Sequence, residues 1–449
     1  MNSRNDLTTG SVVKKLVLFA LPIVGMNLLQ AVYNIVDMII VGQFTDSAGM
    51  SAVSIGGQLT ALVLTVCSGL SNGCSVFLAR LFGAKQEEKM KDYVGTTLSF
   101  LTVFALLLTA CVILLRAPIL HWMNTPAESF RQTEIYLIIC MLGTVFVYGY
   151  GVLSAALRGI GESLHPLIYV IITTVENLIL DLLFVAVFRW GVAGAAAATV
   201  ISQATSMILV ILFIRRKTCL FDFKPASFRI YPDKLRQLLA MGLPQCFQYI
   251  STNLSFLAIS ALVNAYGVAA SAAAGAASKI GTFGMMVGLS FMSALVTLTG
   301  QNHPTKQFGR ILRGMACGMV ISVGVSGVFC LLCQINPAGM YALFTGDPNV
   351  ALAGTDYLRL YSLCFMGEVF MFCMNGVLTG AGYTTVTMIS SVSMAVGVRY
   401  VAALLLSKYT ALGFSGIALA YSISPILGIA IAAYFLISGR WKTPRIATR

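Results

Sequence analysis

The stretch FALPIVGMNLLQAVYNIVDMIIVGQF, residues 19–44, decides the fold class of this chain. It contains one charged side chain, Asp37. A helix needs about 20 mostly apolar residues to cross the hydrocarbon core of a bilayer, so this stretch is predicted to span a membrane. A carboxylate inside such a segment costs about 2.5–3.5 kcal/mol on insertion and is a functional-site hypothesis by default.

The composition of the whole chain excludes a soluble globular protein. Its 449 residues are 58% hydrophobic and only 10% charged, with a mean hydropathy of +0.86. Soluble domains carry about 25% charged residues. Residues 1–15 are polar and basic, and the apolar stretch after them is too long for the core of a cleavable signal. An all-α integral membrane protein is therefore expected.

Apolar segments of spanning length recur along the sequence and predict twelve transmembrane helices. They lie near residues 16–43, 51–79, 93–115, 132–156, 165–188, 192–214, 235–263, 269–299, 310–333, 356–378, 385–407 and 413–437.

The basic residues indicate the orientation of these helices. With the amino terminus inside, 22 Lys and Arg fall on the inner side and 5 on the outer side. This asymmetry is the one that the positive-inside rule describes, and it predicts a multi-pass protein of the cytoplasmic membrane with both termini cytoplasmic. The net charge of +13 is therefore assigned to the anionic inner surface of the bilayer and not to nucleic acid.

Three motifs recur at an offset of 221–222 residues, which indicates two homologous halves. FALPI (19–23) recurs as MGLPQ (241–245), RGIGESLHPLI (158–168) as TGAGYTTVTMI (379–389), and GVAGAAAATVISQ (191–203) as GFSGIALAYSISP (413–425). The predicted organisation is a six-helix lobe over 1–214, a cytoplasmic linker over 215–234 and a second six-helix lobe over 235–449. An even number of spans in each half predicts a pseudo-two-fold axis along the membrane normal.

Three polar residues of the first half are predicted to lie at one depth. Asp37, Asp181 and Thr199 each lie about seven residues from the outer end of their spans, which corresponds to roughly 10 Å below the outer face. Tyr33, Asn34 and Asn177 share helix faces with the two carboxylates. Such a pocket suits a proton, because crowded carboxylates raise each other's pKa, or Na⁺ held by Asp37, Asn177 and Asp181.

Four further ionisable residues lie within predicted spans: Glu176, Lys279, Glu368 and Arg399. We expect the last three to line a substrate cavity, where Glu368 would attract a cationic substrate and the two bases would shape the field around it. A set of structural ion pairs is the alternative. Glu176 is placed with this cavity set, without an assigned partner.

Motifs for chemistry within the chain are missing from the sequence. It has no G-x-x-x-x-G-K-[ST] phosphate-binding loop, and its three His lie near span ends or in loops, so neither ATP hydrolysis nor a Ser/His/Asp enzyme is predicted. No cofactor is expected. A membrane-embedded enzyme is an alternative that would need a nucleophile or a metal-binding constellation, which the sequence does not show.

The motifs at 19–44 and 158–168, together with NLILDLLFV (177–185) and GVAGAAAATVISQ, resemble the multidrug and toxic compound extrusion (MATE) family. The resemblance covers the whole chain. It implies a monomeric secondary transporter that exports cationic or amphipathic organic compounds in exchange for H⁺ or Na⁺, with Asp37, Asn177, Asp181, Thr199 and Tyr33 at the first-lobe cation site.

The resemblance also bears on the second half and on one rival function. Glu368 matches an acid that one branch of the family carries on span 10, but this chain has Thr252 where that branch has a second acid. A lipid-linked saccharide flippase of the same superfamily is the alternative. Its pyrophosphate substrates require clusters of basic residues, which the predicted cavity lacks.

Overall fold

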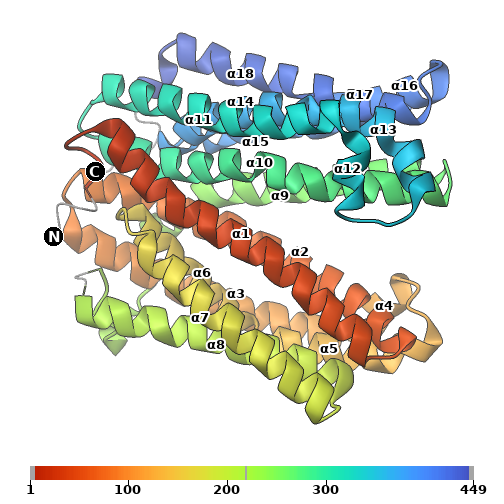
Figure 1. Cartoon of the computed structure of the whole chain (residues 1–449). Helices are drawn as coiled ribbons and strands as arrows, with labels where there is room; N and C mark the ends of the chain where they lie inside the picture. Colours follow the sequence, from red (N-terminus) through yellow and green to blue (C-terminus); the bar gives the residue numbers. More distant parts are fainter. Residues whose placement is uncertain (1–5, 218–219, 444–449) are drawn as a thin grey trace. The chain divides into compact units, whose positions relative to one another are not determined.

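The computed structural model describes residues 6–217 and 220–443; within these ranges the side chains of Asn34, Ile35, Met38, Ile39, Val41 and Lys217 are not described. Throughout these ranges the chain forms helices joined by short loops (Figure 1). The helices include two π-helical segments, η1 and η3, and two 3₁₀ turns, η2 and η4.

Contacts divide the chain into two compact units, one of Gly25–Leu243 and the other of the chain up to Val24 together with Pro244 onward. This division differs from the predicted lobes at two places. The chain up to Val24 groups with the second half, and the predicted linker groups with the first half. Helices α1 and α9 therefore each begin in one unit and end in the other.

The unit of Gly25–Leu243 holds most of α1 and the helices of the first half. Their bounds are α1 (Val12–Phe44), α2 (Ser47–Gly83), α3 (Glu87–Leu114), α4 (Arg116–Trp122), α5 (Ala127–Leu142), α6 (Thr144–Gly159), α7 (Leu164–Asp181), η1 (Leu182–Val187), α8 (Gly191–Lys217) and η2 (Pro225–Ser227).

The second unit holds most of α9 and the helices of the second half. Their bounds are α9 (Pro232–Asn264), α10 (Val268–Asn302), α11 (Phe308–Ile335), α12 (Pro337–Ala342), α13 (Pro348–Ser362), α14 (Cys364–Gly380), α15 (Thr384–Val392), η3 (Ser393–Tyr400), α16 (Val401–Tyr409), α17 (Phe414–Ile423), α18 (Pro425–Ile437) and η4 (Arg440–Lys442).

The number of candidate spans agrees with the sequence prediction. Among the described residues, eleven helices are long and apolar enough to cross a membrane, or twelve if α5 and α6 form one span. These two helices are bent by 42° at their junction. Gly143 lies at the bend, where an added Cβ would be 2.5 Å from Cγ2 of Val200 on α8, so close packing against α8 requires a glycine there.

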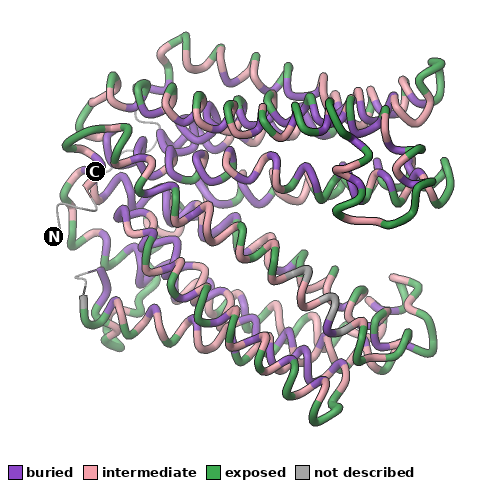
Figure 2. Tube along the Cα trace, in the orientation of Figure 1, coloured by how far each residue is buried: buried purple, intermediate pink, exposed green. Residues whose placement is uncertain are grey.

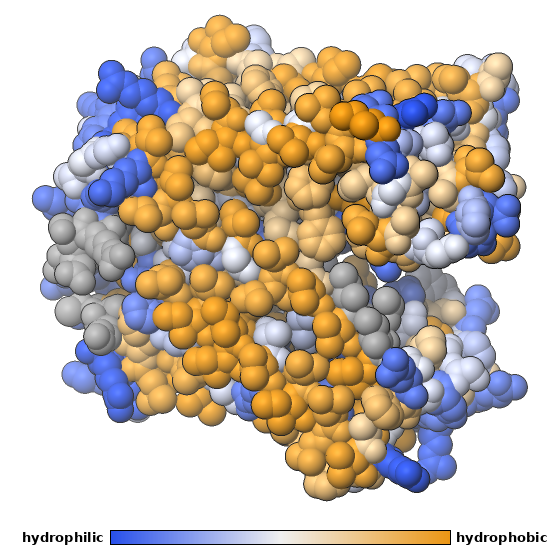
Figure 3. All heavy atoms as spheres, viewed as in Figure 1, coloured by the Kyte–Doolittle hydropathy of each residue, from blue (hydrophilic) through white to orange (hydrophobic). Residues whose placement is uncertain are grey.

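The surfaces of the helices agree with their assignment as membrane-spanning segments. Figure 2 shows buried and exposed positions alternating along most helices, as expected for helices with one packed and one outward face. On the face seen in Figure 3, hydrophobic side chains cover the lengths of the helices and hydrophilic ones gather at their ends. The protein is therefore a multi-pass integral membrane protein.

The segment before α1 is anchored on the α10–α11 hairpin of its own unit. The backbone N–H of Leu7 donates to Gln301 Oε1 at 2.9 Å, and the Asn302 amide donates to the Leu7 carbonyl at 3.2 Å. The Arg310 guanidinium donates to three carbonyls, those of Leu7 at 2.8 Å, Gly10 at 2.6 Å and Thr9 at 2.7 Å. The start of α1 is thus fixed by two buried hydrogen bonds and by the charge-assisted bonds of the more exposed Arg310.

The described part of the predicted linker packs on α3 within the first-half unit. Phe221 is buried, and the Thr96 hydroxyl donates to the Arg229 carbonyl at 3.1 Å. At Gly95 an added Cβ would lie 2.1 Å from the Ser227 carbonyl oxygen. The described part of the linker is therefore held against α3, and only glycine at position 95 allows this close approach.

Candidate functional site

Three helices bring the predicted cation-site residues of the first half together. Tyr33 and Asp37 lie on α1, Asn177 and Asp181 lie on the last turns of α7, and Thr199 lies on α8. The carboxyl groups of Asp37 and Asp181 are near enough to interact, and the Tyr33 hydroxyl is within hydrogen-bonding reach of Thr199. Asn34, the remaining member of the predicted set, lies outside the described side chains.

Two side chains of this cluster are buried without the partners that buried polar groups normally have. Asp181 is 1% exposed and Asn177 is 2% exposed. Neither carboxylate oxygen of Asp181, and neither side-chain atom of Asn177, has a well-formed hydrogen bond to any residue that the structure describes. Buried polar groups are hydrogen-bonded in the great majority of cases, so this arrangement is suited to a bound cation or proton.

Local geometry holds these groups in place. Directly after Asp181 the chain enters the π-helical segment η1, a feature that occurs often at functional sites. Gly191 starts α8 with φ +55°, a conformation that favours glycine. At Gly194 an added Cβ would lie 3.0 Å from Cβ of Phe184, so α8 starts in close contact with η1.

Sequence reasoning missed a second layer of this site on α5 and α2. Tyr136 and Cys140 lie near enough to Asp37 and to each other to interact, and the Cys140 thiol is within reach of Thr60. The Tyr136 ring packs over Gly56, where an added Cβ would lie 2.5 Å from the ring. The sequence signal was weak because none of the three side chains is charged.

Glu176 is separate from the hydrogen bonds of this cluster. Its Oε1 accepts a hydrogen bond from the Thr205 hydroxyl of α8 at 2.9 Å. The next residue of α8, Ser206, donates from its hydroxyl to Thr173 Oγ1 at 3.1 Å, about one turn before Glu176 on α7. The structure therefore gives Glu176 the partner that the sequence did not.

In the second unit, Glu368 and Arg399 form a buried ion pair. An Nη of Arg399 donates to Glu368 Oε1, and Nε donates to the Ser424 hydroxyl at 3.2 Å. The guanidinium carbon lies 4.6 Å from the centre of the Tyr421 ring and 5.6 Å from that of Phe256. The two charges are 7% and 1% exposed, so the structure brings this acid and this base together.

Lys279, the third ionisable residue of the predicted second-half set, does not join this pair. It is exposed on α10, and the ion pairs found among the described residues do not include it. Glu368 and Arg399 thus form an ion pair, as the alternative prediction stated. The prediction that Glu368, Arg399 and Lys279 line a substrate cavity stays a prediction.

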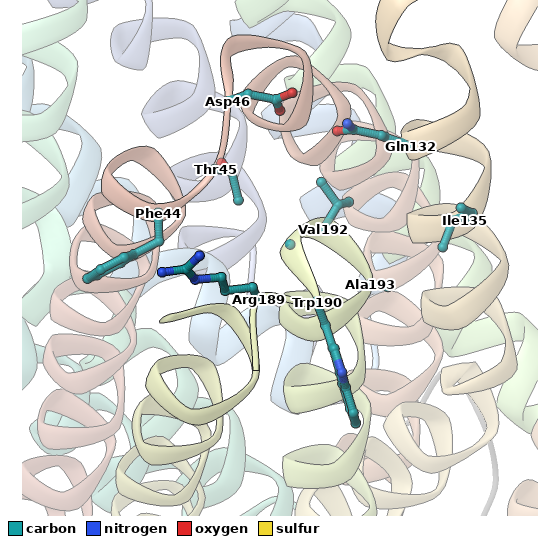
Figure 4. Close-up of a pocket in the computed structure, with 10 residues that line it drawn as sticks. Phe44, Thr45, Asp46, Gln132, Ile135, Arg189, Trp190, Val192 and Ala193 are labelled. Carbon is teal, nitrogen blue, oxygen red and sulfur yellow. The ribbon is translucent and has the colours of Figure 1, made fainter. Parts of the chain in front are cut away.

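A pocket of about 310 Å³ lies at the end of α1 in the first-half unit. Figure 4 shows that its walls come from the α1–α2 turn, α5 and the η1–α8 loop, and its residues include Asp46, Arg189 and Trp190. Asp46 Oδ1 also caps α2 by accepting from the Gly49 N–H at 2.7 Å. None of the predicted site residues lines this pocket.

The MatE family profile matches residues 22–183 and again residues 244–405. The chain belongs to the MATE family. The two matches are offset by 222 residues, the offset that the repeated motifs predict. MATE proteins are transporters, so the membrane-embedded enzyme is set aside.

Individual MATE relatives cover most of the chain. It is 26% identical over 445 residues to the probable multidrug resistance protein YpnP of Bacillus subtilis, with 99% of each chain covered. It is 26% identical over 382 residues to the multidrug export protein MepA of Staphylococcus aureus, covering 83% of this chain and 82% of MepA.

Solved MATE structures share the fold. One is an outward-facing conformation of a multidrug resistance MATE family transporter of the MOP superfamily, which matches with a TM-score of 0.92. That comparison covers 99% of this chain and 100% of the solved one at 19% identity. The predicted all-helical membrane fold is therefore confirmed over the full length.

Proposed function

We propose that this transporter exports cationic and amphipathic organic compounds in exchange for an inward-moving H⁺ or Na⁺, with Asp37 and Asp181 binding the ion. The observation that carries the proposal is the pair of neighbouring carboxyl groups, buried Asp181 and half-buried Asp37, which lies beside a buried Asn177 side chain that has no hydrogen bond to the described residues. The names of YpnP and MepA, which refer to multidrug resistance and multidrug export, support the substrate class.

The exchange follows from the electrostatics of the site. Two carboxylates in a membrane-embedded cluster disfavour each other's ionised form, and a proton or Na⁺ relieves that repulsion. Ion-loaded and ion-free states then differ in free energy, so ion binding can shift the population between two conformations of the transporter. Substrate that binds preferentially to the ion-free conformation is exchanged for the ion.

The flippase alternative has weaker support. A pyrophosphate substrate requires several basic side chains around it. Of the two basic residues predicted within spans, Arg399 is already paired with Glu368, and Lys279 stands apart from that pair. The described residues thus offer acids, and not a basic cluster, for binding a charged ligand inside the spans.

Efflux from vesicles tests the proposal. Purified protein is reconstituted into vesicles loaded with a fluorescent organic cation, and a pH gradient or a Na⁺ gradient is imposed separately. Efflux above that of protein-free vesicles under at least one gradient is expected, and the effective gradient identifies the ion. Equal efflux with and without both gradients would contradict coupled exchange.

A further inference from the structure

The repeat relates Arg399 to the cation cluster of the first half. At the offset of 222 residues, Asn177 corresponds to Arg399, Thr199 to Tyr421, and Tyr33 to Ser255. The turns before the last span of each half agree with this register, because Gly191 has φ +55° and Gly413 has φ +52°. The offset of 222 residues thus pairs each residue of one half with its counterpart in the other by sequence position alone.

The contacts of Arg399 support the correspondence. Its guanidinium packs against Tyr421, the counterpart of Thr199, and against Phe256, which directly follows the counterpart of Tyr33. Arg399 itself lies in the π-helical segment η3, and Asp181 of the first half directly precedes the π-helical segment η1. Arg399 is therefore the counterpart of one residue of the first-half cluster, and it contacts the counterpart of another.

The two halves differ in the charges at this place. The first half has two carboxylates, whereas their counterparts at the same offset are Ile259 and Ala403. The second half has a carboxylate at Glu368 and a fixed positive charge at Arg399. Among the described residues, the Glu368 carboxylate is therefore paired with a positive charge, whereas the ion pairs found there include neither Asp37 nor Asp181.

We propose that the Arg399 guanidinium is a tethered cation that fills the second-half counterpart of the cation site. While Arg399 is present, Glu368 and its aromatic neighbours cannot take an ion from solution. Removal of the Arg399 side chain leaves a latent site for a guanidinium-type cation, with Glu368 as the charge partner, Ser424 as a hydrogen-bonding partner, and Tyr421 and Phe256 as ring partners. This proposal for Arg399 rests on the proposed function in one respect, because that function is what makes the first-half cluster a cation site.

This assignment has a consequence for exchange. A carrier with one open cation site and one internally filled site binds the coupling ion in its first half alone. Glu368 then serves Arg399 and not a cationic substrate, in contrast to the expectation from sequence. Arg399 acts here as a positioning and charge-compensating residue.

Chemical rescue tests the latent site. Arg399→Ala is purified in detergent and its melting temperature is measured with and without methylguanidinium at tens of millimolar. We expect a melting temperature below that of the unsubstituted protein, and a partial recovery with methylguanidinium. Urea, a neutral molecule of similar shape to guanidinium, is the matched control ligand and should give no recovery.

Two further variants make the result specific. Arg399→Lys keeps a tethered charge and should show no response to methylguanidinium, like the unsubstituted protein. Arg399→Gln provides the same rescue test with a polar side chain if Arg399→Ala yields no folded protein. Folded variants that lack Arg399 yet show no methylguanidinium effect, or the same effect in the unsubstituted protein, would overturn the proposal.

The rescue result is independent of transport. If vesicles show no gradient-driven efflux while Arg399→Ala responds to methylguanidinium, the proposed function is contradicted and the proposal for Arg399 is supported. If efflux is coupled but no rescue occurs in the folded variants, the tethered cation fails and the proposed function stands.

Discussion

At the scale of single residues, Asp37 is the group on which ion coupling depends in the proposed mechanism. Asp37→Asn keeps the size and hydrogen-bonding capacity of the side chain and removes its charge. We expect the variant to fold and to bind drug, but to show no efflux driven by an ion gradient, because it mimics the neutralised state permanently. The measurement is dye efflux from vesicles at matched protein content.

Glu134→Gln is a suitable control for that experiment. Glu134 pairs with Arg116 at 2.5 Å in a partly exposed position, with side chains 27% and 37% exposed. The substitution Glu134→Gln therefore removes one carboxylate without changing the Asp37 cluster, and gradient-driven efflux should persist. Gradient-driven efflux by Asp37→Asn at the rate of the control variant would show that another group couples the ion.

A second residue-scale prediction concerns the Glu368–Arg399 pair. Glu368→Gln leaves the Arg399 charge buried without its partner, which is expected to cost about 3–5 kcal/mol of unfolding free energy. Replacing both residues with Gln should cost less, because no charge is then left uncompensated. Unfolding in detergent by heat or denaturant measures both variants.

The partly exposed Arg116–Glu134 pair again gives the comparison. Exposed ion pairs contribute about 0–1 kcal/mol, so Glu134→Gln should scarcely change stability. If Glu368→Gln is no more destabilising than Glu134→Gln, the buried pair is not an essential charge balance. A double variant less stable than Glu368→Gln alone would point to the same conclusion.

At the scale of helices, the sequence predicted the position of the first-half cluster because depth can be counted along a span. Asp37, Asp181 and Thr199 were each placed at a similar distance from the outer end, and the structure places them in one cluster. Tyr136 and Cys140 escaped notice because uncharged residues on an apolar helix give no such signal. The anchor before α1 could not be predicted either. Arg310 binds backbone carbonyls there, and carbonyls are present at every residue of any sequence.

The contact of the linker with α3 gives a prediction at this scale. Gly95→Ala places a methyl group 2.1 Å from the Ser227 carbonyl, so the linker must move away from α3. We expect faster trypsin cleavage after Arg229 in protein with both faces accessible, measured by gel electrophoresis over time. The displaced linker loses the burial of Phe221 and the hydrogen bond of Thr96.

Gly57→Ala on α2 is the matched control for Gly95→Ala. Its added methyl group meets nothing within 4 Å, and alanine favours helix over glycine. The rate of cleavage should therefore stay that of the unsubstituted protein. Unchanged cleavage in Gly95→Ala would mean that the linker does not depend on its contact with α3.

At the scale of the whole molecule, the predicted orientation is open to direct labelling. Single cysteines at Pro225, in the linker, and Gly346, in the loop after α12, are predicted to face opposite sides of the membrane. Cys111, Cys219 and Cys317 are first replaced, because the other eight cysteines are buried. An impermeant maleimide added to intact cells should react with Gly346→Cys alone.

Both positions suit the experiment structurally. Pro225 is exposed, and an added Cβ at Gly346 meets nothing within 4 Å. Permeabilised cells provide the control, since both cysteines should then react. Reaction of Pro225→Cys in intact cells would be incompatible with cytoplasmic termini, because it would place the linker on the outer side.

The helix α1 has a mechanical consequence that follows from its membership of both units. Its beginning, up to Val24, is held with the second half by the anchor at Arg310, and from Gly25 onward it carries Tyr33 and Asp37. Any displacement between the units therefore loads this helix with strain. Pro22 lies just before the crossing and lacks the N–H of an ordinary helical residue, so one hydrogen bond of the helix is missing there and bending is expected at this turn. The residue predicted to bind the ion and the segment held by Arg310 are thus two ends of one continuous lever arm of backbone.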